Sequence, residues 1–118
     1  KSSIKALALE RRGVAKFFKK DYSGAVEDFM AAIEINPNEF PAGSYKILAL
    51  AKDKTNDYEA AILYFNKAIT FEPNASFLYE QLGITKFKAS KSGYCKDWEK
   101  ASSLGSKNAE KFLNKFCS

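Results

Sequence analysis

Apolar residues recur along the middle of the chain with the spacing of a single helical face. They fall at Ala61, Phe65, Ala68 and Ile69, which corresponds to positions i, i+4, i+7 and i+8. An earlier stretch carries the same stripe on Ala25, Phe29, Ala32 and Ile33. Because this period matches the helix and not the strand, the pattern predicts amphipathic helices and gives strands little support.

The two stripes belong to a longer phrase that occurs twice. Residues 21–37 return as residues 57–73 at an offset of 36, with Asp, Tyr, Ala, Phe, Ile and Pro in register. A period of this length is typical of stacked-repeat proteins, in which each unit buries its apolar face only against its neighbours. The repeat therefore predicts the architecture of the chain.

The ends of the helices are marked by caps and prolines. Pro37 and Pro73 close the two copies, because proline cannot continue a helix. Asp21 and Asp57 precede the copies and are candidate N-caps. A further helix is expected before each copy and before a third unit, over residues 3–19, 41–54 and 76–90.

A third, modified unit follows. Residues 93–101 match residues 24–32 with Trp98 in the place of Phe29, and Leu104-Gly105 stands where the closing proline is missing. A last helix is predicted over residues 107–117. Its apolar face is formed by Ala109, Phe112, Leu113 and Phe116. Such a helix covers the exposed apolar face of a final repeat.

These units resemble the tetratricopeptide repeat, a helix-turn-helix unit of 34 residues. The matching positions are the small residues Gly13, Ala49 and Gly83, the packing alanines Ala25 and Ala61, the aromatics Phe29, Phe65 and Trp98, the second alanines Ala32, Ala68 and Ala101, and the prolines Pro37 and Pro73. The resemblance implies an all-α, right-handed superhelix. Its parts would be three repeats over residues 6–39, 42–75 and 76–105 and a capping helix over 107–117, in one domain of residues 1–118.

Some positions depart from the family pattern. Arg12 replaces the usual leucine of the first unit, which we attribute to a terminal helix with no preceding repeat. Tyr94 replaces the packing alanine of the third unit. About two extra residues lie in the connection around residues 39–43, between the first and second units.

The resemblance also implies a function, since first helices of successive repeats line a concave groove that binds proteins. The candidate groove residues are Leu7, Glu10, Val14, Phe17, Lys46, Leu50, Asp53, Phe77, Glu80, Ile84 and Phe87. This set is apolar at its centre and carries charges of both signs, which suits an extended or helical peptide held by apolar anchors. The chain is therefore expected to be an adaptor or scaffold that binds a protein or peptide partner.

Other interpretations of the same residues remain open. Val14, Leu50 and Ile84 would also serve simply to pack one helix against the next. The chain would alternatively be a structural element of a longer array, or self-associate through its first helix around Ile4 and Leu7. One known mode of the family grips a peptide's C-terminal carboxylate with lysine and asparagine; Glu10 and Val14 occupy two of those sites and disfavour it.

The net charge of +5 is concentrated at one end of the chain. Up to Thr85 basic and acidic residues balance, and the excess comes from lysines after that residue. A basic end can attract anionic partners. However, this region has no arginine and no interleaved aromatic ladder, so nucleic-acid binding is not expected.

The sequence offers no candidate catalytic or metal-binding residues. It contains no histidine, the commonest general base and metal ligand, and no glycine-rich phosphate loop or serine nucleophile motif. No apolar stretch reaches the length of about 20 residues that a membrane span needs. We therefore expect a protein that is not an enzyme and that uses no cofactor or metal.

The two cysteines, Cys95 and Cys117, flank the predicted turn after Gly105 symmetrically. If the helices on either side run antiparallel, both sulfurs reach the same end of the hairpin and can form a disulfide. A bonded pair would indicate an exported protein, periplasmic or at the cell surface. Two reduced cysteines in a cytoplasmic protein are the alternative, and the sequence does not decide between them.

Overall fold

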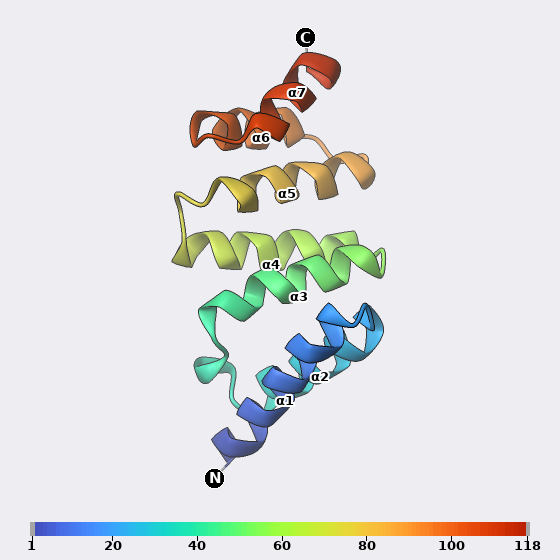
Figure 1. The fold of residues 1–118 in the computed structure, drawn as a ribbon, viewed down its shortest axis with the longest axis vertical. Coiled ribbons are helices and arrows are strands. Elements are labelled where there is room, and N and C mark those ends of the chain that lie inside the picture. Colours follow the sequence, from blue (N-terminus) through green and yellow to red (C-terminus); the bar gives the residue numbers. More distant parts are fainter. Residues whose placement is uncertain (1, 118) are drawn as a thin grey trace.

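The structure, a computed structural model, describes residues 2–117 and consists there of helices and their connections, without strands. The helices are α1 (Ser2–Phe18), α2 (Tyr22–Ile35), α3 (Ala42–Lys54), α4 (Tyr58–Phe71), α5 (Ser76–Lys88), α6 (Tyr94–Ser103) and α7 (Lys107–Phe116), with a short 3₁₀ turn η1 (Pro37–Glu39). They pile up in chain order from one end of the molecule to the other (Figure 1). The all-α superhelix of helix pairs predicted from the sequence is confirmed.

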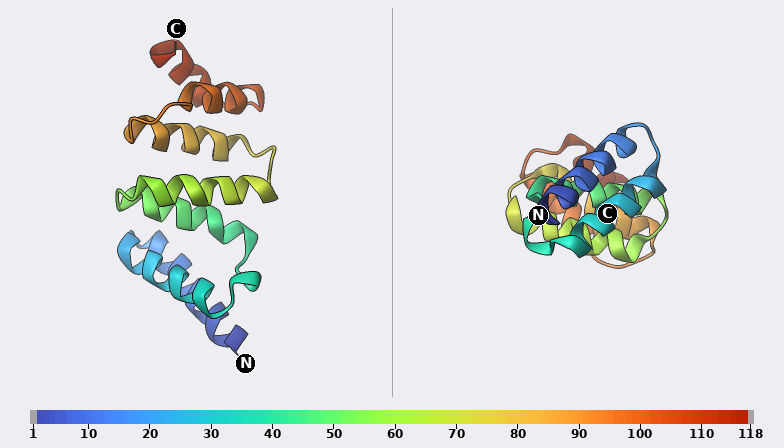
Figure 2. Two further views of the ribbon diagram at one scale, coloured as in Figure 1. Left: turned by 180° about the vertical axis from the view of Figure 1, so that it is seen from behind. Right: turned by 90° about the horizontal axis from the view of Figure 1, so that it is seen from below.

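The molecule is a rod, because each helix pair contacts mainly its neighbours along the stack. It measures 52 × 24 × 22 Å, and its ends carry the two termini (Figure 2). The radius of gyration of 14.9 Å exceeds the roughly 13 Å typical of a compact chain of about this length. A rod of this width leaves every helix partly accessible to solvent.

Within a pair, the helices cross where a residue without a side chain faces an aromatic ring. A Cβ added to Gly13 would lie 2.8 Å from the ring of Phe29, and one added to Gly83 would lie 2.4 Å from the indole nitrogen of Trp98. Both rings are almost fully buried. Two of the small-residue positions that carried the family resemblance therefore lie where the helices of the first and third pairs leave no room for a side chain.

The predicted N-caps are confirmed. The side chain of Asp21 accepts a hydrogen bond from the Gly24 amide at 3.0 Å, and Asp57 accepts one from the Ala60 amide at 3.3 Å. Ser106 caps α7 in the same way, at 3.0 Å from the Ala109 amide. Each cap satisfies an amide that has no partner inside the helix.

The extra residues between the first two units follow η1 and insert one aromatic side chain into the stack. Phe40 is buried, with its ring edge-on to Phe29 at 5.8 Å and to Tyr45 at 4.8 Å between centroids. The insertion thus fills the space between the first and second units with an aromatic ring.

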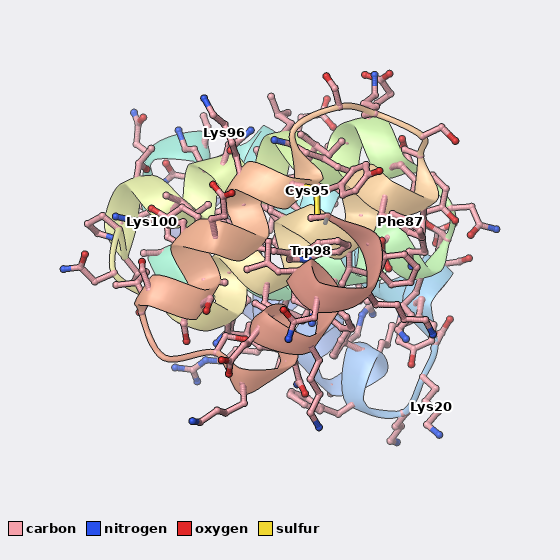
Figure 3. All side chains as sticks on the ribbon, turned by 90° about the horizontal axis from the view of Figure 1, so that it is seen from above. Lys20, Phe87, Cys95, Lys96, Trp98 and Lys100 are labelled. Carbon is pink, nitrogen blue, oxygen red and sulfur yellow. A yellow bond between two sulfur atoms is a disulfide. The ribbon has the colours of Figure 1, made fainter. Side chains whose placement is uncertain are left out.

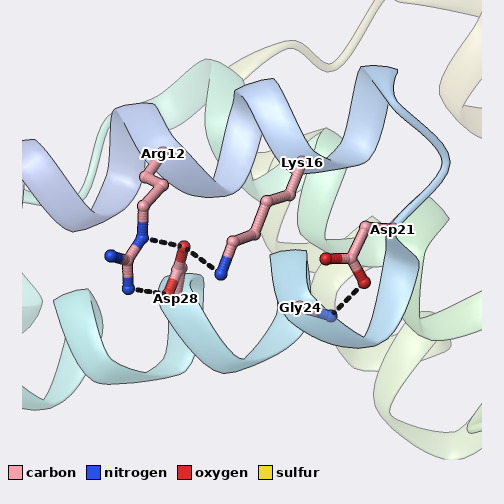
Figure 4. Close-up of polar contacts among 5 residues, drawn as sticks. All are labelled: Arg12, Lys16, Asp21, Gly24 and Asp28. Carbon is pink, nitrogen blue, oxygen red and sulfur yellow. Dashed lines mark hydrogen bonds and ion pairs between the residues drawn. The ribbon is translucent and has the colours of Figure 1, made fainter.

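Arg12 is more than a tolerated polar residue on a terminal helix. Its guanidinium donates two hydrogen bonds to the carboxylate of Asp28, at 2.8 and 2.9 Å, and Lys16 approaches the same carboxylate at 3.2 Å (Figure 4). Asp28 is buried on α2, so the pairing joins the two helices of the first unit. The sequence interpretation missed this contact because Asp28 lies in the second helix.

The third unit also contains an aspartate beside a cation, but there the pKa of the aspartate changes in the opposite direction. The hydrogen bonds from Arg12 lower the pKa of Asp28, although burial acts against them. Asp97 lies 2.9 Å from Lys86, but burial is the larger influence and raises the pKa of Asp97. Two cations, Arg12 and Lys16, approach Asp28, whereas among the described residues Asp97 has Lys86 alone, so the cations outweigh burial at Asp28 but not at Asp97.

The sulfurs of Cys95 and Cys117 are bonded, with their Cα atoms 5.9 Å apart. The bond links the start of α6 to the residue after α7, beside Trp98 and Phe87 (Figure 3). Trp98 packs on Phe112 and Phe116, at 5.1 and 6.1 Å between ring centroids. The disulfide and these rings together hold the last helix against the third unit.

The glycine–aromatic crossing predicts a specific cost of adding one methyl group. Gly13→Ala is expected to lower the free energy of unfolding by about 1–3 kcal/mol, because the buried ring of Phe29 has to move. Gly43→Ala is the control, since its added Cβ meets no atom within 4 Å and alanine favours the helix. Urea unfolding measures both, and equal stability of the two variants would contradict the packing interpretation.

The two aspartates predict opposite pH dependences. Because the native pKa of Asp28 is lowered, its stabilisation is present above its unfolded-state pKa and is lost as the pH falls through the native value. The stability difference between the wild type and Asp28→Asn should therefore shrink from pH 7 to pH 3. For Asp97→Asn the wild type should gain relative to the variant on acidification, because the pKa is raised. Parallel trends in thermal unfolding of the two variants would refute this assignment.

Candidate functional site

One side of the rod is formed by the first helices of the three units, which we call the first-helix face. Hydrogen bonds between successive first helices define it: Ser44 on α3 donates to Glu10 on α1, and Thr85 on α5 donates to Asp53 on α3 at 2.8 Å. The second helices form the opposite side, where the Tyr64 hydroxyl contacts the Met30 sulfur at 3.6 Å. All of the predicted groove residues lie on α1, α3 or α5.

The three predicted acidic residues of this face lie in the seams between units. Glu10 and Asp53 are buried, and Glu80 is half-buried. Asp53 also pairs with Lys88 at 2.7 Å, while Glu80 accepts a hydrogen bond from Ser106 at 2.7 Å. Each carboxylate thus has a partner on the following unit or on the capping helix. Glu10 and Asp53 thereby join successive first helices, while Glu80 joins α5 to the N-terminal end of α7, so none of the three is simply a solvated charge.

The predicted apolar residues divide into two groups. Val14, Leu50 and Ile84 are half-buried and pack against the cores, as the helix-packing alternative predicts, while part of each side chain remains accessible. Leu7, Phe77 and Phe87 are exposed by 45%, 43% and 39%. Three of the predicted apolar side chains are therefore accessible on this face, two of them on α5.

The remaining predicted residues contribute rings and charge. Phe17 is half-buried against the rings of Phe18 and Tyr22. The Lys46 ammonium lies 5.9 Å from the centre of the Phe77 ring, a cation–π distance that bridges α3 and α5. Phe87 joins the aromatic cluster under the disulfide, with its ring 4.7 Å from that of Phe116.

Among the hollows on the described part of the molecule, two that the sequence did not indicate border the first unit. One, of about 230 Å³, lies at the N-terminal end of the first-helix face and includes Leu7 and Glu10 from the predicted set. The other, of about 520 Å³, lies between α2 and α4 on the opposite side and includes Tyr45, Leu63 and Tyr64. Both hollows are bordered by the α2–α3 connection. The extra residues in that connection are the sequence feature that could have indicated them.

The described residues provide no cluster of three or more side chains suited to holding a metal ion. In the same part of the chain, no helix combines the length and apolar character needed to cross a membrane.

Comparison with known proteins identifies relatives of both sequence and fold. Residues 6–39 and 42–75 match the tetratricopeptide repeat family. Mitochondrial import receptor subunit TOM70 of Saccharomyces cerevisiae is 38% identical over 82 residues, which are 70% of this chain but only 13% of TOM70. The chain therefore spans a small part of that relative's length.

Solved structures with the same fold cover almost the whole chain. The Arabidopsis OM64 TPR domain aligns with a TM-score of 0.78 at 21% identity, covering 98% of each chain. The first TPR of Spaghetti (RPAP3), bound to an HSP90 peptide, aligns with a TM-score of 0.78 at 22% identity over 96% of this chain and 90% of its own. The second TPR domain of human RPAP3, in complex with an HSP70 peptide, gives 0.77 at 24% identity over 98% and 97%.

The family match covers more than half of the chain and agrees with the stacked helix pairs and their glycine–aromatic crossings. Domains of this kind generally mediate interactions between proteins and are in general not enzymes. The chain belongs to the tetratricopeptide repeat family.

Proposed function

We propose that this chain binds a segment of a partner protein along the first-helix face, without chemistry of its own. The observation that carries the proposal is the exposure of Leu7, Phe77 and Phe87 on that face. Exposed apolar and aromatic side chains of this kind are the usual anchors of peptide recognition. The peptide complexes of two structural neighbours support the use of this fold for the same purpose.

The partner segment we propose is internal and contacts the face through apolar side chains. The acidic groups of the face already accept hydrogen bonds from the next unit, so its free contact surface is mainly apolar. The peptides in the two neighbouring complexes end in Glu-Glu-Val-Asp. An acidic C-terminus of that kind would approach the carboxylate of Glu10, where the carboxylate-gripping mode of the family would need a cation.

A matched pair of substitutions tests the proposal. Peptides would be selected from a random displayed library on the wild-type chain and their affinities measured by fluorescence anisotropy. Phe77→Asp should weaken binding at least about ten-fold, since a buried apolar anchor is typically worth 1–2 kcal/mol or more. Leu63→Asp, which alters a 61% exposed leucine on the opposite side, should leave the affinity unchanged.

Equal losses in the two variants, or none in Phe77→Asp, would reject the first-helix face as the binding surface. Sedimentation of the free chain distinguishes self-association through α1 from binding of a separate partner. That alternative requires a molecular mass that rises with concentration and returns to the monomer value in Leu7→Glu, because Leu7 is exposed.

We also propose that the chain functions in an oxidising compartment, as the Cys95–Cys117 bond supports. Replacing both cysteines by serine should lower the free energy of unfolding by about 3 kcal/mol, from the chain entropy of the 22-residue separation. The compartment is tested on protein isolated from its natural source. The protein is alkylated without reductant, and mass spectrometry then shows whether the two cysteines are bonded. Two alkylated thiols in freshly isolated protein would contradict it.

A further inference from the structure

The hollow at the N-terminal end of the first-helix face is formed by three segments. Ile4 and Leu7 come from α1, Ala32 from the end of α2, and Phe40 and Pro41 from the connection to α3. This connection lies beside the start of α1 in both side views (Figures 1 and 2). We call this hollow the N-terminal pocket. Its volume of about 230 Å³ is below the roughly 300–1,000 Å³ of small-molecule sites, so it suits one side chain.

The charged groups that line the N-terminal pocket are both acidic. Glu10 is only 7% exposed, and Glu39 lies exposed at the rim. One oxygen of Glu10, Oε2, accepts the hydrogen bond from Ser44. Within residues 4–117, Oε1 has neither a hydrogen bond nor an ion pair, and the lining includes no lysine or arginine. The pocket therefore presents a buried, partly satisfied carboxylate among mainly apolar walls, to which Asn36 also contributes.

This combination discriminates between kinds of side chain. A purely apolar side chain would remove the remaining water from Glu10 without replacing its hydrogen bonds, which is unfavourable. An acidic side chain would place like charges together. Lysine and arginine have an apolar stem for the walls and a cationic head for the carboxylate, and charge-assisted hydrogen bonds of this kind are the stronger ones.

We propose that the N-terminal pocket binds a lysine or arginine side chain of the partner segment, with the segment's neighbouring apolar residues on Ile4 and Leu7. These two residues are exposed by 72% and 45% and form the outer wall. The inference rests on the proposed function, because the pocket is the end of the same face. It adds a specificity: the partner segment is apolar with a basic residue at one end.

The test uses two blocked peptides that differ only in the charge of the central side chain. Acetyl-Ala-Leu-Lys-Leu-Ala-amide and its norleucine counterpart would be titrated into the ¹⁵N-labelled chain and followed by NMR. The lysine peptide should shift the amides of Ala6, Ala32 and Phe40, which line or border the pocket. The norleucine peptide should bind at least about five-fold more weakly, as expected when a partly desolvated ion pair is lost.

Three substitutions assign the effect to the pocket. Glu10→Gln keeps an oxygen to accept the Ser44 hydrogen bond and should weaken the lysine peptide about ten-fold. Glu39→Gln, at the exposed rim, should weaken it about two- to five-fold and cannot be explained by misfolding. Glu34→Gln is the control, since Glu34 is exposed on α2 and does not line the pocket.

The outcomes separate this inference from the proposed function. Equal affinity for the two peptides, or no shifts at the pocket at millimolar peptide, overturns the cation site, and Phe77→Asp still tests the face independently. A chain that dimerises, with Glu39→Gln restoring the monomer in sedimentation, overturns the partner segment as the occupant of the pocket. The occupant would then be a second copy, whose α7 carries Lys111 and Lys115 beside apolar residues.

Discussion

The structure depends on how closely two helices approach within each unit. In the first and third units a glycine lies directly against a fully buried aromatic ring, Phe29 in one and Trp98 in the other. In the second unit the equivalent residues, Ala49 and Phe65, are completely buried. Close-packed interiors do not accommodate an added methyl group without displacement, so these crossings set the shape of each helix pair.

Successive helix pairs are joined to one another by polar contacts as well as by apolar ones. Glu10, Asp53 and Glu80 each accept a hydrogen bond from a hydroxyl of the next unit or of the cap. Buried carboxylates are costly unless they are hydrogen-bonded, which makes these contacts selective for one register of the stack. The apolar side chains between them, such as Leu50, then lie at defined positions along the first-helix face.

This division of roles connects the architecture to binding. Since the crossings and seams bury the small and acidic residues, the groups left accessible on the face are chiefly apolar rings and aliphatic chains, Leu7, Phe77 and Phe87. The N-terminal pocket is the exception, because Glu10 faces a hollow there as well as its partner Ser44. The face thus carries apolar side chains along its length, with the Lys46 cation on α3, and is acidic at its N-terminal end. This distribution gives a bound segment a direction.

The sequence by itself determined the helix pairs, their caps and the stacked architecture. These features depend on local periodicity and on residues such as Pro37 and Asp21, whose physical preferences act within one or two turns. The sequence also indicated the Cys95–Cys117 disulfide as one of two alternatives, the other being two reduced cysteines, because both residues lie at the same end of one predicted helical hairpin.

Only the tertiary structure decided what the predicted face residues do. The partners of Glu10, Asp53 and Glu80 lie 34, 32 and 26 residues further along the chain, so periodicity could show that these acids share a face but not that they are engaged. The N-terminal pocket likewise requires α1, the end of α2 and the inserted connection to meet. Helical period is a property of neighbouring residues, whereas burial, ion pairing and a cavity arise only when distant segments exclude water together.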